Sequence, residues 1–201
     1  IRISDWSSDV CSSDLSVPEL IDVIADRLAR YNAENVVLDP VMVATSGAKL
    51  ISDDAVEVMT GKLFPLAKLI TPNIPETEAL TGISVKSVAD MENAARCIYG
   101  KYGCAVLVKG GHSINDANDM LFDGENITWF SGKRIDNPNT HGTGCTLSSA
   151  IASNLAKEYD VSDSVRMAKQ YISGALAAML DLGSGSGPLN HGFDIRSRYM
   201  L

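Results

Sequence analysis

A glycine-rich segment that ends in a cysteine is the part of the sequence that most directly indicates chemistry. It reads Asn-Thr-His-Gly-Thr-Gly-Cys-Thr over residues 139–146, where a long helix is predicted to begin. Glycine allows tight turns that bring successive N–H groups to one point, and a helix N-terminus adds donors and a positive dipole end. We therefore expect this segment to bind an anion, such as a phosphoryl group in transfer. A glycine-rich helix cap without a ligand is the alternative.

Cys145 falls in the first turn of that predicted helix. The N-terminal amides of a helix favour the thiolate form of a cysteine, so this side chain could accept the proton of a substrate alcohol as a general base. The alternative is a small buried residue, a common role for cysteine. We expect His141, in the same loop, to shape the loop rather than to act in the chemistry.

Polar residues stand at the ends of three short apolar segments that are predicted to be strands. They are Asp39 after 36–38, Asn73 after 68–71, and Lys109 at the end of 105–109. In open α/β sheets, ligands bind beyond the carboxyl ends of the strands, so these residues are expected to bind phosphates. Lys109 would neutralise a phosphate as a point charge.

Asp39 and Glu76 are the carboxylates expected at a magnesium site, because Mg²⁺ takes one or two protein carboxylates and keeps several waters. Asn73 and Glu76 are three residues apart and could reach one water or cation. Each residue also has a simpler interpretation. Asp39 could be a turn residue before proline, Glu76 a first-turn carboxylate facing the helix dipole, and Lys109 a solvated strand end.

The elements that would position these residues alternate between helix and strand. The sequence predicts an α/β fold with a mainly parallel sheet. Residue 16 is the predicted N-cap of a helix that follows it, and Ser52 and Ser87 are predicted to cap helices over 53–64 and 88–100. Further predictions are a helix over 75–81 closed by Gly82, antiparallel strands over 119–123 and 126–130, a possible strand over 133–136, helices over 143–158 and 163–181, and a flexible loop over 183–188.

Composition limits the class of protein. The 201 residues carry a net charge of -8 and are 45% hydrophobic, as expected for one globular domain and not for a protein that binds nucleic acid or an anionic membrane. The four cysteines form no Cys-x-x-Cys pair, so a zinc site or disulfide framework is not expected. Free thiols and the absence of a targeting signal in this sequence favour a cytoplasmic location.

Residues 1–15 repeat Ser-Ser-Asp and follow neither a helical nor a strand period. We interpret them as a non-native leader, similar to translated sequencing adapter, with a native polar tail as the alternative. Residues 16–201 are then the part of the chain that belongs to the folded domain.

Five segments resemble the hydroxymethylpyrimidine/phosphomethylpyrimidine kinases of the ribokinase-like superfamily. The similarity runs from about Ser16 to the C-terminus, and its most specific part is the Gly-Thr-Gly-Cys sequence. The segments are Asp39-Pro-Val-Met-Val-Ala-Thr-Ser-Gly47, Thr71-Pro-Asn-Ile-Pro-Glu76, Val108-Lys-Gly-Gly-His112, His141-Gly-Thr-Gly-Cys-Thr-Leu-Ser148 and Gly187-Pro-Leu-Asn-His191.

The resemblance implies an ATP- and Mg²⁺-dependent kinase that phosphorylates a hydroxymethylpyrimidine and then its monophosphate in thiamine biosynthesis. Cys145 would be the base, and the 142–145 amides would form the anion hole. Asp39 and Glu76 would organise Mg²⁺ and the phosphates of ATP with support from Asn73. Lys109 would reach the transferring phosphoryl group, and Val41 would line the pyrimidine pocket.

Members of this family begin with strands that supply much of the pyrimidine pocket and part of a homodimer interface. This sequence has no counterpart of them, so we expect little or no turnover by the 201 residues alone and an exposed strand near 36–38. Two other functions stay open: a pyridoxal kinase of the same fold, and a nucleotide-binding module without catalysis.

Overall fold

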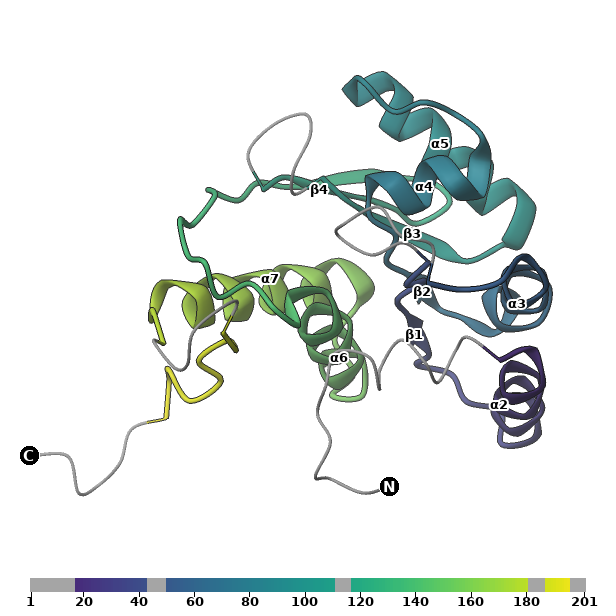
Figure 1. Ribbon diagram of the computed structural model, residues 1–201, viewed down its shortest axis with the longest axis horizontal. Helices are drawn as coiled ribbons and strands as arrows, with labels where there is room; N and C mark the ends of the chain where they lie inside the picture. The colour runs from purple at the N-terminus through teal and green to yellow at the C-terminus, as the bar shows by residue number, and fades with distance from the viewer. Residues whose placement is uncertain (1–16, 43–49, 111–116, 181–186, 196–201) are drawn as a thin grey trace, which may run out of the picture. The chain divides into compact units, whose positions relative to one another are not determined.

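The computed structural model describes residues 17–42, 50–110, 117–180 and 187–195 (Figure 1). The chain divides into two compact units, residues 1–131 and 132–201. The leader predicted over 1–15, the predicted N-cap at 16, His112, and residues 183–186 of the predicted flexible loop lie outside the described residues.

The first unit is built on a five-stranded mixed sheet with helices, which confirms the α/β prediction. The first three strands run parallel, and the last two are antiparallel to their neighbours, as predicted for residues 119–123 and 126–130. In spatial order, the strands are β1 (Val37–Leu38), β2 (Leu69–Ile70), β3 (Ala105–Lys109), β4 (Asp119–Phe122) and β5 (Ile127–Phe130).

Strand register places the candidate site residues at the carboxyl ends of the parallel strands. Leu38 pairs with Ile70, and Ile70 pairs with Val106, so the residues that follow β1 and β2 lie at the same level. A further bridge joins Asn73 to Lys109. Among the described residues β1 is an edge strand, and its Leu38 is buried.

The described residues of this unit form four α-helices, and the predicted caps of two of them are confirmed. The side chains of Ser52 and Ser87 accept hydrogen bonds from backbone N–H groups, and Gly82 closes its helix with a left-handed φ of 71°. The helices are α2 (Pro18–Arg30), α3 (Asp53–Val58), α4 (Ile74–Thr81) and α5 (Val88–Tyr102).

Two helix predictions in this unit need correction. The helix expected over 53–64 ends at Val58 and continues as a π turn (Met59–Leu63) and a 3-10 turn (Phe64–Leu66). Gly61 weakens the α-helix at this point, and Pro65 has no N–H to continue it. For α2 the structure places Val17 at the N-cap, without a side-chain hydrogen bond.

In the second unit the described residues form two packed helices, α6 (Thr143–Leu155) and α7 (Val161–Ala177). Their apolar faces are buried, with Leu147 and Ile151 on α6 and Val165 and Ile172 on α7. Helix α7 begins two residues before the predicted position because the side chain of Asp160 accepts a hydrogen bond from the backbone N–H of Asp163.

The strand considered for 133–136 is wrong, because residues 132–140 are all described and none of them is in a strand. Lys133, Arg134 and Asp136 are exposed, so the segment has no apolar face to bury in a sheet.

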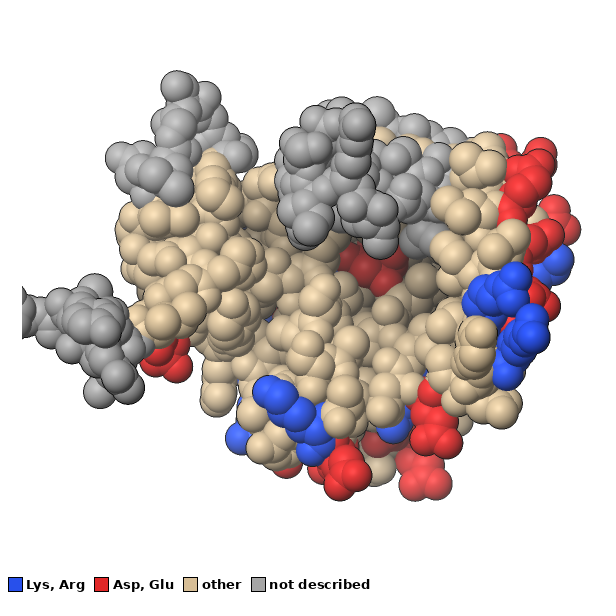
Figure 2. Space-filling view, turned by 90° about the horizontal axis from the view of Figure 1, so that it is seen from below, with Lys and Arg blue, Asp and Glu red and all other residues tan. Residues whose placement is uncertain are grey.

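Within the described ranges, no helix is long and apolar enough to cross a membrane. On the face drawn in Figure 2, lysine and arginine side chains lie beside aspartate and glutamate, and the described residues there form no continuous basic area.

Candidate active site

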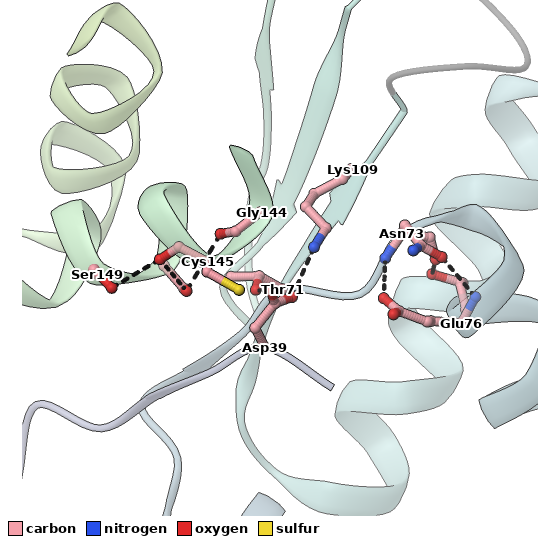
Figure 3. A network of polar contacts seen from close by, with 10 residues as sticks. Asp39, Thr71, Asn73, Glu76, Lys109, Gly144, Cys145 and Ser149 are labelled. Carbon is pink, nitrogen blue, oxygen red and sulfur yellow. Dashed lines mark hydrogen bonds and ion pairs between the residues drawn. The ribbon is translucent and has the colours of Figure 1, made fainter. Parts of the chain in front are cut away.

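An ion pair between Asp39 and Lys109 lies at the carboxyl edge of the sheet (Figure 3). The Nζ of Lys109 is 2.7 Å from Oδ1 of Asp39, although the residues are 70 positions apart in sequence. The Oγ1 of Thr71 donates to the same carboxylate oxygen at 3.0 Å. The side chains of Asp39 and Lys109 are 11% and 17% exposed, so the charges are partly shielded from water but still reachable.

Asn73 and Glu76 form a reciprocal capping box at the start of α4. The side-chain oxygen of Asn73 accepts from the backbone N–H of Glu76 at 2.8 Å, and Oε2 of Glu76 accepts from the backbone N–H of Asn73 at 2.7 Å. This geometry matches the simpler interpretation of the two residues as a helix start. It also fixes the carboxylate of Glu76 in one orientation near the Asp39–Lys109 pair.

Glu76 is only 2% exposed, which is unusual for a carboxylate in the first turn of a helix. Burial raises the pKa of Glu76 to about 7, the positive charge of Lys109 and the backbone N–H of Asn73 lower this pKa, and the negative charge of Asp39 raises it. A carboxylate held in this way is half-protonated near neutral pH, and a nearby cation would favour its ionised form.

The charge and oxygen donors of Asp39 and Glu76 fit a magnesium ion that is held partly through water and phosphate. Within the described ranges, no group of three or more His, Cys, Asp or Glu side chains is placed to hold a metal. Mg²⁺ does not need such a cage, because it is commonly bound through one or two carboxylates together with waters and substrate phosphates.

Val41 is half-buried and lies two residues beyond Asp39, whose carbonyl accepts a hydrogen bond from the Val41 N–H at 2.9 Å. The backbone of Met42, the next residue, also lowers the pKa of Glu76, so the segment after β1 lies close to the start of α4. The predicted role of Val41 in a pyrimidine pocket stays a prediction.

In the second unit, the glycine-rich loop leads directly into α6, as predicted. Gly142 is the N-cap, with a φ of 78°, and it has no side-chain cap. Its carbonyl accepts from the backbone N–H and the hydroxyl of Thr146, at 2.9 and 2.8 Å. The hydroxyl of Thr143 donates to the carbonyl of Thr140 at 2.6 Å, which closes the turn before the helix.

Cys145 is exposed in the first turn of α6. Its carbonyl accepts hydrogen bonds from the hydroxyls of Ser148 and Ser149, at 3.0 and 2.7 Å (Figure 3). The alternative of a small buried residue is therefore wrong for Cys145. Cys104, in contrast, is a buried residue of this kind. It is 3% exposed, and burial raises its pKa to about 11.

The structure thus gathers four of the predicted site residues in the first unit, namely Asp39, Asn73, Glu76 and Lys109. It places Gly142, Thr143, Gly144 and Cys145 together at a helix N-terminus in the second unit. Their functional roles stay predictions.

Sequence reasoning missed Thr71 and two asparagines, Asn137 and Asn139. Thr71 is fully buried and bonded to Asp39, and both asparagines are buried and hydrogen-bonded at both ends of their amides. Thr71 could have been found as a polar residue at the end of an apolar strand. No sequence signal indicated the partners of the asparagines.

The family model that describes phosphomethylpyrimidine kinase matches residues 15–190 of this chain. A thiamine biosynthesis bifunctional protein of Geobacter sulfurreducens is 46% identical over 200 residues, which are 97% of this chain and 41% of that protein. A hydroxymethylpyrimidine/phosphomethylpyrimidine kinase of Streptomyces coelicolor is 43% identical over 179 residues, which are 89% of this chain and 66% of that protein.

Among solved structures, an ADP complex of Bacillus subtilis pyridoxal kinase superposes with a TM-score of 0.78 at 33% identity, over 88% of this chain and 66% of that one. This similarity confirms the expected ribokinase-like α/β fold. The chain spans 41% and 66% of the length of the two curated relatives. The match over 15–190 includes every candidate site residue, and the chain belongs to the phosphomethylpyrimidine kinase family.

Proposed function

We propose that the protein from which this chain comes transfers the γ-phosphoryl group of ATP to the hydroxymethyl oxygen of a hydroxymethylpyrimidine, and then phosphorylates the monophosphate. The observation that carries the proposal is an exposed Cys145 in the first turn of α6, directly after a Gly-Thr-Gly loop, in a chain of this family. Identity of 43% to a hydroxymethylpyrimidine/phosphomethylpyrimidine kinase supports the same substrate class.

In this proposal Cys145 is the general base. Its thiolate takes the proton of the substrate hydroxyl, the oxygen attacks the γ-phosphorus, and the bond from that phosphorus to the bridging oxygen of ADP breaks. The backbone amides over 142–145 donate to the phosphoryl oxygens as their charge builds up, which is where fixed donors stabilise the transition state most.

The family resemblance implies charge and positioning roles for residues of the first unit. Lys109, which is paired with Asp39, would neutralise charge on the transferring phosphoryl group. Asp39 and Glu76 would hold Mg²⁺ through water and phosphate, with Asn73 keeping the Glu76 carboxylate oriented. When bound, the ion would neutralise the negative charge of the phosphates. Val41 would contact the pyrimidine.

The test is ATP-dependent phosphorylation of 4-amino-5-hydroxymethyl-2-methylpyrimidine, followed by mass spectrometry of the product. We expect Cys145→Ala in the complete protein to lower kcat at least about a hundredfold, the typical contribution of a general base. Cys97→Ala is the matched control, because Cys97 is also exposed but lies on α5. Equal activity of the wild type and Cys145→Ala would overturn the role of the thiol.

A second substrate is favoured by the similarity to a pyridoxal kinase at a TM-score of 0.78. The assay therefore includes pyridoxal as the competing alcohol. If kcat/KM is higher for pyridoxal than for the pyrimidine, pyridoxal becomes the proposed substrate. ATP binding without transfer to either alcohol would support a nucleotide-binding module instead.

Two further proposals concern the complete protein and rest on the family resemblance: a homodimer and a cytoplasmic location. Light scattering after size-exclusion chromatography tests the first, and cell fractionation tests the second. A monomer at micromolar concentration would contradict the dimer.

A further inference from the structure

Asn139 uses both ends of its buried amide to join two other segments of the second unit. Its Nδ2 donates to the carbonyl of Leu180, just beyond α7, at 2.5 Å. Its Oδ1 accepts from the backbone N–H of Gly187 at 2.7 Å, across 48 positions of sequence. The residue is 8% exposed, so water does not readily replace either partner.

The neighbouring Asn137 extends this connection. Its Nδ2 donates to the carbonyl of Leu176 in the last turn of α7 at 2.7 Å, and its Oδ1 accepts from the backbone N–H of Asn139 at 2.8 Å. A bridge also joins His141 to Pro188. Residues 137–141 are thus fixed between the end of α7 and the segment that begins at Gly187.

The segment before α6 has other contacts, but they are short-range: the N–H of Thr140 donates to the carbonyl of Pro138, and the N–H and hydroxyl of Thr143 donate to the carbonyl of Thr140. Residues 132–140 are described and belong to no helix or strand, and the N-cap Gly142 has no side-chain cap. Among the contacts described for this segment, the asparagine side chains supply the long-range ones, which hold the backbone before the helix against Leu176, Leu180 and Gly187. The direction in which the first amides of α6 point follows from that backbone.

We propose that Asn139 is a positioning residue for phosphoryl transfer. Its side chain connects the Gly187–His191 segment to the glycine-rich loop, whose amides bind the phosphate in the proposed function. The inference rests on the proposed function, and it gives a role to a C-terminal segment that had none. Asn139 itself does not touch the substrate in this role. It acts through the placement of Gly142 to Cys145.

Asn154 offers a matched control for a purely structural role. It is also 8% exposed, lies in the same unit, and donates through Nδ2 to the carbonyl of Ser164 at 3.3 Å. It lies near the C-terminal end of α6, away from the glycine-rich loop. Asn154→Ala should therefore affect the stability of the unit without changing the amides at the start of α6.

The experiment measures alkylation of Cys145 by iodoacetamide in the complete protein, using mass spectrometry of the peptide that contains it. ATP is added at increasing concentration to find the level that halves the alkylation rate. We expect Asn139→Ala to need at least about tenfold more ATP than the wild type, since small misplacements at such sites have large effects. Asn154→Ala should match the wild type.

Asn139→Asp is a second variant that keeps the shape and the acceptor for the Gly187 N–H but loses the donor to Leu180. We expect the ATP concentration that halves its alkylation rate to lie between those of the wild type and Asn139→Ala. This variant keeps the test decisive if the alanine variant does not fold. The pH profile of alkylation without ATP is a second readout. It should move to higher pH in Asn139→Ala, because misdirected amides favour the thiolate less.

The outcomes separate the two proposals. If ATP does not slow alkylation of wild-type Cys145, the phosphate site itself is wrong and the proposed function fails. If ATP protects the wild type and both Asn139 variants equally, the function stands and the positioning role of Asn139 is overturned. Equal losses in Asn139→Ala and Asn154→Ala would also overturn it, because they would indicate general destabilisation.

Discussion

At the scale of single residues, one oxygen of Asp39 receives both the ammonium of Lys109 and the hydroxyl of Thr71. The hydroxyl orients the carboxylate, which in turn fixes the position of the lysine nitrogen. Thr71 is completely buried, so neither the hydroxyl nor the carboxylate can easily exchange this contact for water.

Thr71→Val keeps the size of the side chain and removes the hydroxyl. We expect it to lower the free energy of unfolding by about 2 kcal/mol, the usual range for a hydrogen bond to a charged group, and to weaken ATP binding. Urea unfolding and titration calorimetry measure the two effects. Thr71→Ser keeps the hydroxyl and should bind ATP like the wild type, and equal ATP affinities of the valine and serine variants would contradict the role of the hydroxyl.

The buried Glu76 predicts a dependence of stability on pH. Its pKa in the folded chain is about 7 against 4.5 for the ordinary carboxyl, so the folded state keeps a proton that the unfolded state loses. Stability contributed by this group is therefore lost as pH rises from about 4.5 to 7, by about 3 kcal/mol at 1.36 kcal/mol per pH unit.

Glu76→Gln removes that titration while keeping an oxygen for the N–H of Asn73. We expect urea unfolding in EDTA to show a smaller loss of stability between pH 5 and 8 than in the wild type. Glu78→Gln is the control, because Glu78 is on the same helix and accepts the Val85 N–H at 2.7 Å without being fully buried. An unchanged pH profile in Glu76→Gln would show that another group is responsible.

At the scale of elements, α6 begins at a glycine with left-handed backbone, and α4 ends at one. Gly142 and Gly82 have φ of 78° and 71°, and a Cβ at either position would meet nothing within 4 Å. Substitution by alanine therefore costs backbone strain alone, about 1–2 kcal/mol at each site. Comparing alanine variants at the two glycines therefore separates an effect on stability from an effect on ATP binding.

We expect Gly142→Ala and Gly82→Ala to lower the free energy of unfolding by similar amounts. Only Gly142→Ala should weaken ATP binding, because it alone alters the start of α6. Thermal unfolding with and without ATP measures both. Loss of ATP binding in both variants would indicate that general destabilisation, and not the geometry of the loop, explains the result.

At the scale of the whole molecule, the chain divides into two compact units between Ser131 and Gly132. Lys133 and Arg134 follow this boundary, are exposed, and are in neither helix nor strand. Exposed irregular segments are the preferred sites of proteolysis, because a protease must bind several residues in extended form.

Brief treatment with trypsin should therefore cut after Lys133 or Arg134 and yield two fragments that mass spectrometry can identify. The variant with both residues changed to Gln should resist this cut, while cleavage elsewhere continues. If trypsin cuts first inside α5 or α7, the boundary between the two units is wrongly placed.

The local parts of this protein could be predicted from the sequence. The Ser52 and Ser87 caps, the Gly82 stop and the Gly-Thr-Gly-Cys helix start all depend on residues within a few positions of one another. The strand considered for 133–136 was wrong because a strand also needs a partner from another part of the chain, which local sequence does not reveal.

By itself, then, the sequence determined the α/β class, the helix boundaries set by caps and glycines, and the residues that resemble a kinase family. Only the tertiary structure decided that Thr71 bonds to Asp39, that Glu76 is buried, and that Asn139 reaches Gly187. These contacts join residues 32 and 48 positions apart, or depend on burial by several elements at once. Spacing along the chain carries no signal of such distances, because the path between the partners is set by packing of the whole unit.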